Sequence, residues 1–119
     1  MVLEVGWAYG PGGHALEGKM LMQVITTGGP AHSYSASGYH LHTLREFFLP
    51  FEQTTKLCRM QYLPPFVTHG THRITSDDLK TQLHLVDALF ALLQKEQPDF
   101  ETLQKFSYAN DYLKLTTHE

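Results

Sequence analysis

Two short apolar runs in the chain are typical of buried β-strands. The first, Lys19–Thr26 (KMLMQVIT), lies between Gly18 and Gly28-Gly29, and its apolar residues are nearly continuous. Such continuity predicts a strand of a parallel sheet that is covered on both faces. The second run lies within Arg59–Gly70 and is split by Pro64-Pro65. Because proline donates no ladder hydrogen bond, we expect this strand at the edge of the sheet.

Helical periodicity follows each of these runs. From Leu41 onward the pattern is helical but contains Pro50, which predicts a bent helix or two short helices, with Pro50 near the start of the second. Thr75 and Asp78 have the spacing of an N-terminal cap, so a long helix is expected from about 76 to 97, ended by Pro98. The residues expected to face the core are Leu44, Phe47, Phe48, Phe51 and Leu57 in the first segment and Leu79, Leu83, Val86, Phe90 and Leu93 in the second.

The order strand, loop, helix, strand, helix is that of the second half of a doubly wound α/β sheet. Two strands are fewer than the roughly 4 to 6 of a typical sheet. The sequence therefore predicts a single partial domain over residues 1–119, with further strands expected on the amino-terminal side. We expect its core within 6–97, and a polar carboxyl-terminal tail over 98–119 with one short amphipathic turn around Leu103 and Phe106.

Length and charge narrow the functional classes. A chain of 119 residues has room for one domain at most. Nine basic against twelve acidic residues give a formal charge of -3, and no run of Lys or Arg exists, so a nonspecific nucleic-acid groove is excluded. The single cysteine, Cys58, allows no internal disulfide, and Met1–Trp7 lacks the features of a signal peptide. We expect a cytoplasmic protein, soluble or at most peripheral at the inner face of the membrane.

The loop after the first strand is the main candidate for ligand binding. Pro30–Gly38 is small and polar, and loops at the carboxyl ends of parallel strands bind ligands in open α/β sheets. In Thr26-Thr27-Gly28-Gly29, two glycines would let the backbone approach a flat ring and direct N–H groups at its electron-rich edge. The alternative is an ordinary tight turn.

Several blocks of residues together resemble one known family. They are Gly6-Trp7-Ala8-Tyr9-Gly10, Gly12-Gly13, Leu16-Glu17-Gly18-Lys19, Thr26-Thr27-Gly28-Gly29 and Tyr62-Leu63-Pro64-Pro65-Phe66. In this order they are similar to blocks of the flavodoxin-like NAD(P)H:quinone oxidoreductases, which include the DT-diaphorase type and the bacterial ancillary oxidoreductases of glutathione-gated potassium-efflux systems. The similarity extends to about Lys95.

The resemblance implies a flavodoxin-like three-layer sandwich, of which this chain supplies the last two strands and their helices. It also implies an FMN or FAD cofactor, NAD(P)H as hydride donor, and two-electron ping-pong reduction of a quinone in a homodimer. By position, Thr26, Thr27, Gly28, Gly29 and Tyr34 match residues that bind the flavin.

The same resemblance gives roles to Tyr34 and to four further residues. Tyr34 and His40 match the tyrosine and histidine beside the flavin's pyrimidine ring, where a phenol and an imidazole can donate to the negative charge of the reduced cofactor. Packing of Tyr34 and solvation of His40 are the alternatives. Trp7 and Tyr9 match an aromatic segment that reaches the partner's flavin and forms a wall of the substrate pocket, and an ordinary core pair under the glycine-rich stretch Gly10 to Gly13 is the alternative. Phe66 is a further candidate for this pocket, with packing as its alternative.

No metal site or nucleophile is expected. The eight histidines give only two local pairs, His40-X-His42 and His69-X-X-His72, without carboxylate or thiolate partners at a definable spacing, and solvated loop histidines explain them. Cys58 lacks an identifiable base.

Three functions stay open at this point. The protein is an NAD(P)H-dependent quinone reductase, an ancillary regulatory subunit of a potassium-efflux transporter, or a non-catalytic half-domain completed by another segment. The family's phosphate-binding loop precedes the segment seen here, so the chain alone is expected to bind flavin weakly or not at all.

Overall fold

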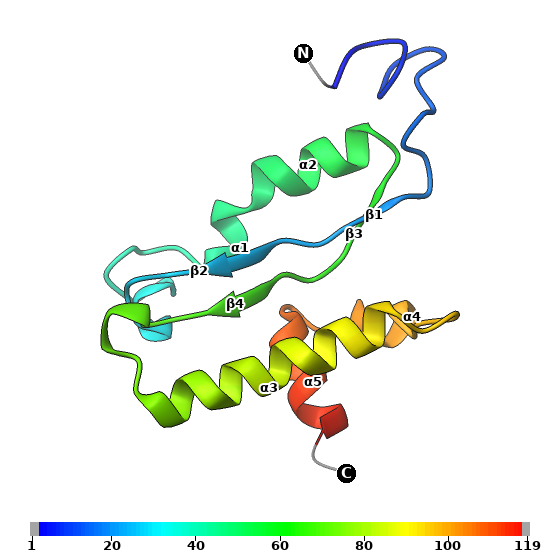
Figure 1. Cartoon of the computed structure of the whole chain (residues 1–119). Coiled ribbons are helices and arrows are strands. Elements are labelled where there is room, and N and C mark those ends of the chain that lie inside the picture. The colour runs from blue at the N-terminus through cyan, green and yellow to red at the C-terminus, as the bar shows by residue number, and fades with distance from the viewer. Residues whose placement is uncertain (1–2, 118–119) are drawn as a thin grey trace.

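The structure is a computed structural model that describes residues 3–117. Its strands and helices alternate as the sequence predicts (Figure 1). The elements are β1 (Met20–Leu21), β2 (Val24–Thr26), a 3₁₀ turn (Ala31–Ser33), α1 (Leu44–Phe47), α2 (Leu49–Leu57), β3 (Gln61–Tyr62), β4 (Phe66–Thr68), a second 3₁₀ turn (Thr71–Arg73), α3 (Ser76–Leu93), α4 (Phe100–Leu103) and α5 (Ala109–Thr117).

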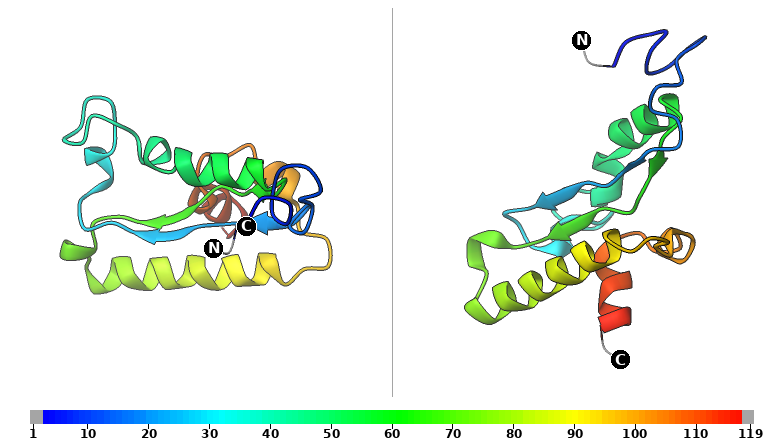
Figure 2. Two further views of the ribbon diagram at one scale, coloured as in Figure 1. Left: turned by 90° about the horizontal axis from the view of Figure 1, so that it is seen from above. Right: turned by 45° about the vertical axis from the view of Figure 1, so that its right-hand side comes forward.

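Each predicted strand is present as two short pieces, and all pairing is parallel. β1 pairs with β3, and β2 pairs with β4 in the register Val24 to Phe66 through Thr26 to Thr68. The break in the second strand falls at Pro64-Pro65, as expected. Helix α2 covers one face of the strands and α3 the other, which gives the three layers seen in Figure 2. The α/β class, with parallel strands between two helical layers, is therefore confirmed.

The first helical segment is two helices, as Pro50 predicts. Pro50 lies in the first turn of α2, where its missing N–H costs no helical hydrogen bond. Thr43 begins α1 with a reciprocal capping box to Glu46. Leu44 and Phe48 are buried against Val67, whereas Phe47, Phe51 and Leu57 are about half exposed. The predicted apolar face of this segment is therefore only partly buried within the chain.

The long helix begins as predicted but ends earlier and buries a different face. The Thr75 side chain accepts a hydrogen bond from Asp78 N–H, and α3 stops at Leu93 rather than near residue 97. Its buried residues are Leu85, Leu89 and Leu92. Four of the five residues of the predicted stripe do not face the core of this chain: Leu79, Leu83, Phe90 and Leu93 are all more than 40% exposed, whereas Val86 is partly buried and packs against the core.

The carboxyl-terminal residues are part of the main core, which corrects the expectation of a polar tail. Leu103 and Ala109 are fully buried, and Tyr112 and Leu113 pack with Leu63, Phe66 and the buried face of α3. The short turn expected near Leu103 is α4, but α5 was not foreseen. The core therefore extends past the predicted limit at residue 97.

Helix α5 also closes one edge of the sheet. The Asn110 side chain is 8% exposed, accepts a hydrogen bond from Val67 N–H at 2.8 Å and donates to Val67 C=O at 2.8 Å. These two bonds satisfy the backbone of β4 on the side away from β2, in the way that a neighbouring strand would. Among the described residues no strand pairs with the other edge of β2, where Val24 is 62% exposed.

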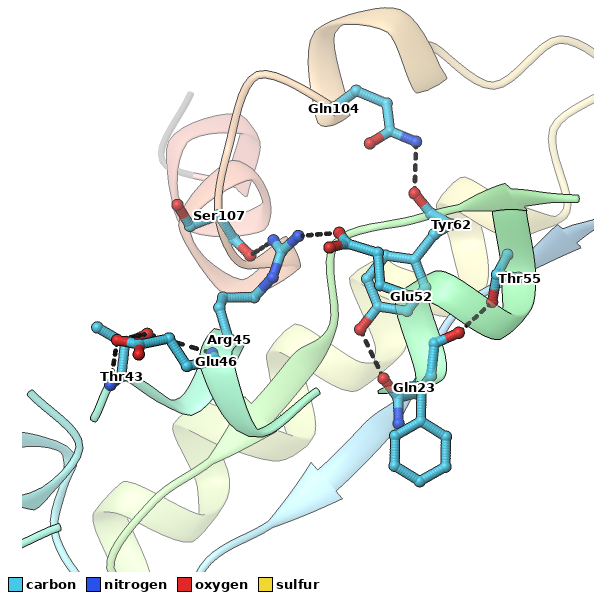
Figure 3. A network of polar contacts seen from close by, with 10 residues as sticks. Gln23, Thr43, Arg45, Glu46, Glu52, Thr55, Tyr62, Gln104 and Ser107 are labelled. Carbon is cyan, nitrogen blue, oxygen red and sulfur yellow. Dashed lines mark hydrogen bonds and ion pairs between the residues drawn. The ribbon is translucent and has the colours of Figure 1, made fainter. Parts of the chain in front are cut away.

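Arg45 joins α1 to α2 and to the segment before α5 (Figure 3). Its guanidinium donates to Ser107 C=O at 2.5 Å and to Glu52 Oε1 at 2.9 Å, and lies 5.6 Å from the centre of the Tyr62 ring. On the same side Gln104 donates to Tyr62 C=O at 2.8 Å. These contacts hold Gln104 and Ser107 against Tyr62 and the helices α1 and α2.

We expect Arg45→Met to lower the free energy of unfolding by about 1–2 kcal/mol. The substitution removes the guanidinium, so the Glu52 carboxylate and the Ser107 carbonyl both lose a partly buried hydrogen-bond donor. Urea unfolding of the chain measures this. Glu17→Gln is the matched control, since its ion pair with His14 is more than half exposed, and it should change stability by less than about 0.5 kcal/mol. Equal effects of the two substitutions would contradict the network.

Candidate functional site

Two loops meet at the carboxyl edge of the strands. Thr27-Gly28-Gly29 follows β2, and His69-Gly70-Thr71-His72 follows β4. Because β2 and β4 are parallel, both loops leave the sheet at the same edge. Backbone bonds tie them together: Thr27 C=O accepts from Thr71 N–H at 3.0 Å, and Gly29 C=O accepts from Gly70 N–H at 2.8 Å.

Thr27 is the anchor of this loop pair. It is 7% exposed, and its N–H donates to Thr68 C=O at 2.9 Å. Its hydroxyl donates to Gly29 C=O at 2.9 Å and lies 2.8 Å from His69 Nδ1. Thr26, by contrast, is the last residue of β2 and has an exposed side chain. The first loop is thus held by Thr27 rather than by Thr26.

Tyr34 and His40, the predicted catalytic pair, lie together beside this anchor. Their ring centroids are 4.6 Å apart, and the Tyr34 ring lies 5.5 Å from that of His69. Phe47 packs edge-on against both Tyr34 and His40. His40 N–H donates to Ser33 C=O at 3.0 Å, which closes the loop. The loop after β2 therefore brings a phenol and an imidazole together, with the phenol beside the His69 ring that contacts the Thr27 hydroxyl.

The two glycines differ in their surroundings. A Cβ on Gly28 would overlap the imidazole of His72, whereas a Cβ on Gly29 would meet only Ser33 Oγ, at 3.9 Å. Within residues 3–117 neither N–H donates to another group of the chain. The amide donors required for a flavin ring are therefore present, but the space beside Gly28 is filled by His72.

His69 is the residue that sequence reasoning missed. His72 is exposed, as expected of a solvated loop histidine, but His69 is half-buried and bonded to Thr27, and burial lowers the pKa of His69 below its usual 6.5. The available signal was the position of His69 directly after β4, at the same edge as the glycine pair. His69 also borders two surface concavities of about 310 and 370 Å³.

Trp7 and Tyr9 are not brought to these loops. Residues 3–18 precede β1 and lie at the opposite end of the strands from Thr27 (Figure 1). Trp7 is 49% exposed. Within one chain these aromatic residues cannot form a wall of the same pocket, so their predicted role requires a partner subunit.

The assignment of Phe66 to a substrate pocket was wrong. Its side chain is 1% exposed and packs in the main core with Leu63 and Leu89. The Phe66 side chain therefore lies in the layer between β4 and α3. Its role in this chain is packing.

Residues 3–117 contain no cluster of three or more His, Cys, Asp or Glu side chains placed to hold a metal ion. None of their helices has the length and hydropathy needed to cross a bilayer. Cys58, at the end of α2, is buried.

Comparison with known proteins identifies similar chains. A family profile described as flavodoxin-like fold matches residues 1–90. General stress protein 14 of Bacillus subtilis is 40% identical over 79 residues, which are 66% of this chain and 45% of that protein. The glutathione-regulated potassium-efflux system ancillary protein KefG of Erwinia tasmaniensis is 38% identical over 79 residues, 66% of this chain and 43% of KefG. The chain thus spans less than half the length of these two relatives.

Two solved structures share the fold. The NADPH-quinone reductase from P. pentosaceus superposes with a TM-score of 0.68 at 26% identity, covering 82% of this chain and 55% of that one. General stress protein 14 from Treponema denticola, solved in complex with FMN, superposes with a TM-score of 0.60 at 36% identity, covering 74% and 52%. The segment matched by the family profile, residues 1–90, contains β1 to β4 and the loops between them.

Proposed function

The chain belongs to the family of flavodoxin-like proteins, and from this premise we propose that it forms the ring-binding half of an NAD(P)H-dependent flavin oxidoreductase. The observation that carries the proposal is the loop after β2. There the free N–H groups of Gly28 and Gly29, the Tyr34 phenol and the His40 imidazole lie at the carboxyl edge of parallel strands. Similarity to an NADPH-quinone reductase and to a protein solved with FMN supports it.

Each group has a defined task in this proposal. The flavin, FMN or FAD, supplies two-electron redox chemistry when bound. Gly28 and Gly29 hold the ring through their amides, and Thr26 and Thr27 form the strand end beneath it. Tyr34 and His40 are the proposed catalytic residues, because a phenol and an imidazole in contact can donate hydrogen bonds to a developing anion and pass on a proton. NAD(P)H and a quinone are the proposed substrates, used in turn at one pocket.

We propose a homodimer, which the position of Trp7 and Tyr9 supports. Because they lie far from Thr27 in their own chain, we propose that they form the pocket wall of a second subunit. Similarity to KefG also leads us to propose a cytoplasmic protein that docks on a membrane potassium-efflux transporter. Pull-down of the transporter's cytosolic domain by this chain tests the docking, and its failure with a correctly folded chain would exclude it.

A half-domain that needs completion is the second candidate, favoured by the open edge of β2. Val24 lies on this open edge and is exposed, and Leu79, Leu83, Phe90 and Leu93 of α3 are exposed as well. The chain purified alone is then expected to lack the flavin absorption bands near ~370 and ~450 nm, since flavin affinity depends on a phosphate-binding loop outside the matched segment. Stoichiometric flavin on the isolated chain would contradict this.

The activity is tested by adding the part of a relative that this chain does not match. The chain is co-expressed with the part of Bacillus subtilis general stress protein 14 that it does not match, and NADPH-dependent reduction of 1,4-benzoquinone is measured with added FMN. Tyr34→Phe, which removes one donor, should lower kcat about tenfold with little change in KM. Tyr39→Phe is the matched control because Tyr39 is 86% exposed. A folded, FMN-loaded complex without reductase activity would overturn the proposed enzyme.

A further inference from the structure

The hydrogen bonds of Thr27 fix the proton position on His69. The Thr27 hydroxyl has one proton and lies close to two groups, Gly29 C=O at 2.9 Å and His69 Nδ1 at 2.8 Å. A carbonyl oxygen can only accept, so the hydroxyl proton is directed to Gly29. The Thr27 oxygen must then accept from His69, and Nδ1 carries the imidazole proton.

This arrangement leaves the other ring nitrogen as a bare acceptor. In the neutral imidazole only one nitrogen is protonated, so Nε2 keeps its lone pair. Burial favours this neutral form because it lowers the pKa of His69 below 6.5. Within the described chain Nε2 has no hydrogen-bond donor. The titratable and charged residues around the ring and its two concavities are Tyr34, Arg73, Asp78, Tyr108, Asp111 and Lys114.

The acceptor lies in the same loop pair as the free amide donors. His69 is joined to Thr27, and Gly28 and Gly29 follow directly with N–H groups that bind no other described residue. One loop pair therefore offers both N–H donors and a nitrogen acceptor. This combination complements a ligand edge in which an N–H stands beside C=O groups, as in a cyclic imide or a primary carboxamide.

We propose that His69 is a ligand-binding residue whose Nε2 accepts a hydrogen bond from the N–H of an amide or imide edge on the ring ligand, while the glycine amides donate to the adjacent carbonyl. The proposal rests on the proposed function in one respect, that this site takes a flavin or a nicotinamide. Both carry such an edge, the flavin as an imide and the nicotinamide as a carboxamide.

The tautomer is tested first, without any ligand. Long-range ¹H–¹⁵N spectra of the chain at neutral pH should show His69 protonated on Nδ1, and Thr27→Val should return the proton to Nε2. A wild-type His69 protonated on Nε2 would overturn the proposal. Because this measurement needs no cofactor, its result does not depend on the proposed function.

Ligand binding is tested with three probes at millimolar concentration: FMN, FMN methylated at the imide nitrogen, and nicotinamide mononucleotide. The wild-type chain should bind the probe with a free N–H about 5–10-fold more tightly than its methylated analogue, the value of roughly one hydrogen bond. His69→Phe should abolish this preference, and His69→Gln, whose amide oxygen can stand in for Nε2, should restore it. His84→Phe, on the exposed side of α3, is the control.

The outcomes separate the two ideas. One outcome is that the chain binds nicotinamide mononucleotide but not FMN, that His69→Phe loses this binding and that His69→Gln recovers it. This outcome supports the acceptor role of His69 and removes the flavin as its ligand. A preference for free N–H that survives in His69→Phe overturns the role of His69 while leaving a flavin site in place. If neither nucleotide changes the ¹⁵N chemical shifts of the His69 ring, the acceptor role is overturned.

Discussion

Replacing Phe66 with alanine is expected to lower the free energy of unfolding by about 3–5 kcal/mol, the cost of a cavity left by a fully buried aromatic ring. Phe66 is 1% exposed and packs between the strand layer and α3. Urea unfolding followed by far-UV circular dichroism measures the change. Because such a loss can unfold a small chain outright, Phe66→Leu, with an expected cost of about 1–1.5 kcal/mol, keeps the effect measurable.

The matched control is Phe51→Ala. Phe51 lies on α2 and is 57% exposed, so its removal should change the stability of the chain by less than about 1 kcal/mol. A side chain that lines a substrate pocket would behave like Phe51. If Phe66→Ala and Phe51→Ala had equal effects on unfolding, Phe66 would belong to a pocket wall and the core described above would be wrong.

The layout of the fold could be predicted from local signals. Pro64-Pro65 marks the break between β3 and β4, Pro50 marks the start of α2, and Thr75 with Asp78 marks the start of α3. Each of these acts through backbone geometry within a few residues, so sequence alone carries the information. The parallel pairing followed from the continuous apolar run of the first strand.

The buried face of α3 could not be predicted in the same way. The helix has two apolar stripes, one through Leu85, Leu89 and Leu92 and one from Leu79 to Leu93. Periodicity shows that both are apolar but not which layer each meets. In this chain the first stripe is covered by α5, a helix with too few apolar residues to be recognised from sequence.

Sequence reasoning found the candidate residues on the loop after β2 but missed the contact between that loop and the loop after β4. Tyr34 and His40 stand on the loop after β2, which resembles the loop of known flavin enzymes, and the structure brings them together. The contact of His69 with Thr27 joins residues 42 positions apart. Such a contact depends on the register of β2 against β4, which no local pattern reveals.

Replacing Asn110 with alanine is expected to lower the free energy of unfolding by about 2–4 kcal/mol. The reason is that the buried N–H and C=O of Val67 would both lose their hydrogen-bond partner. Urea unfolding of the chain measures it. The neighbouring exposed residue gives the control, Asp111→Ala, which should stay within about 0.5 kcal/mol of the original chain. A loss below 1 kcal/mol in Asn110→Ala would show that water replaces the amide and that the edge of β4 is open.

Asn110→Asp separates the two hydrogen bonds by pH. Its carboxylate can accept from Val67 N–H but cannot donate to Val67 C=O, so the protonated acid is favoured in the folded chain and its pKa should rise above the usual value of about 3.9. A group with a raised pKa in the folded state stabilises at low pH and loses that contribution as pH rises through this pKa. Relative to the original chain, Asn110→Asp should therefore be least stable at pH 7 and recover as the pH falls toward 4. A stability difference that stays constant over this range would mean that the side chain at position 110 faces solvent and does not seal the outer edge of β4.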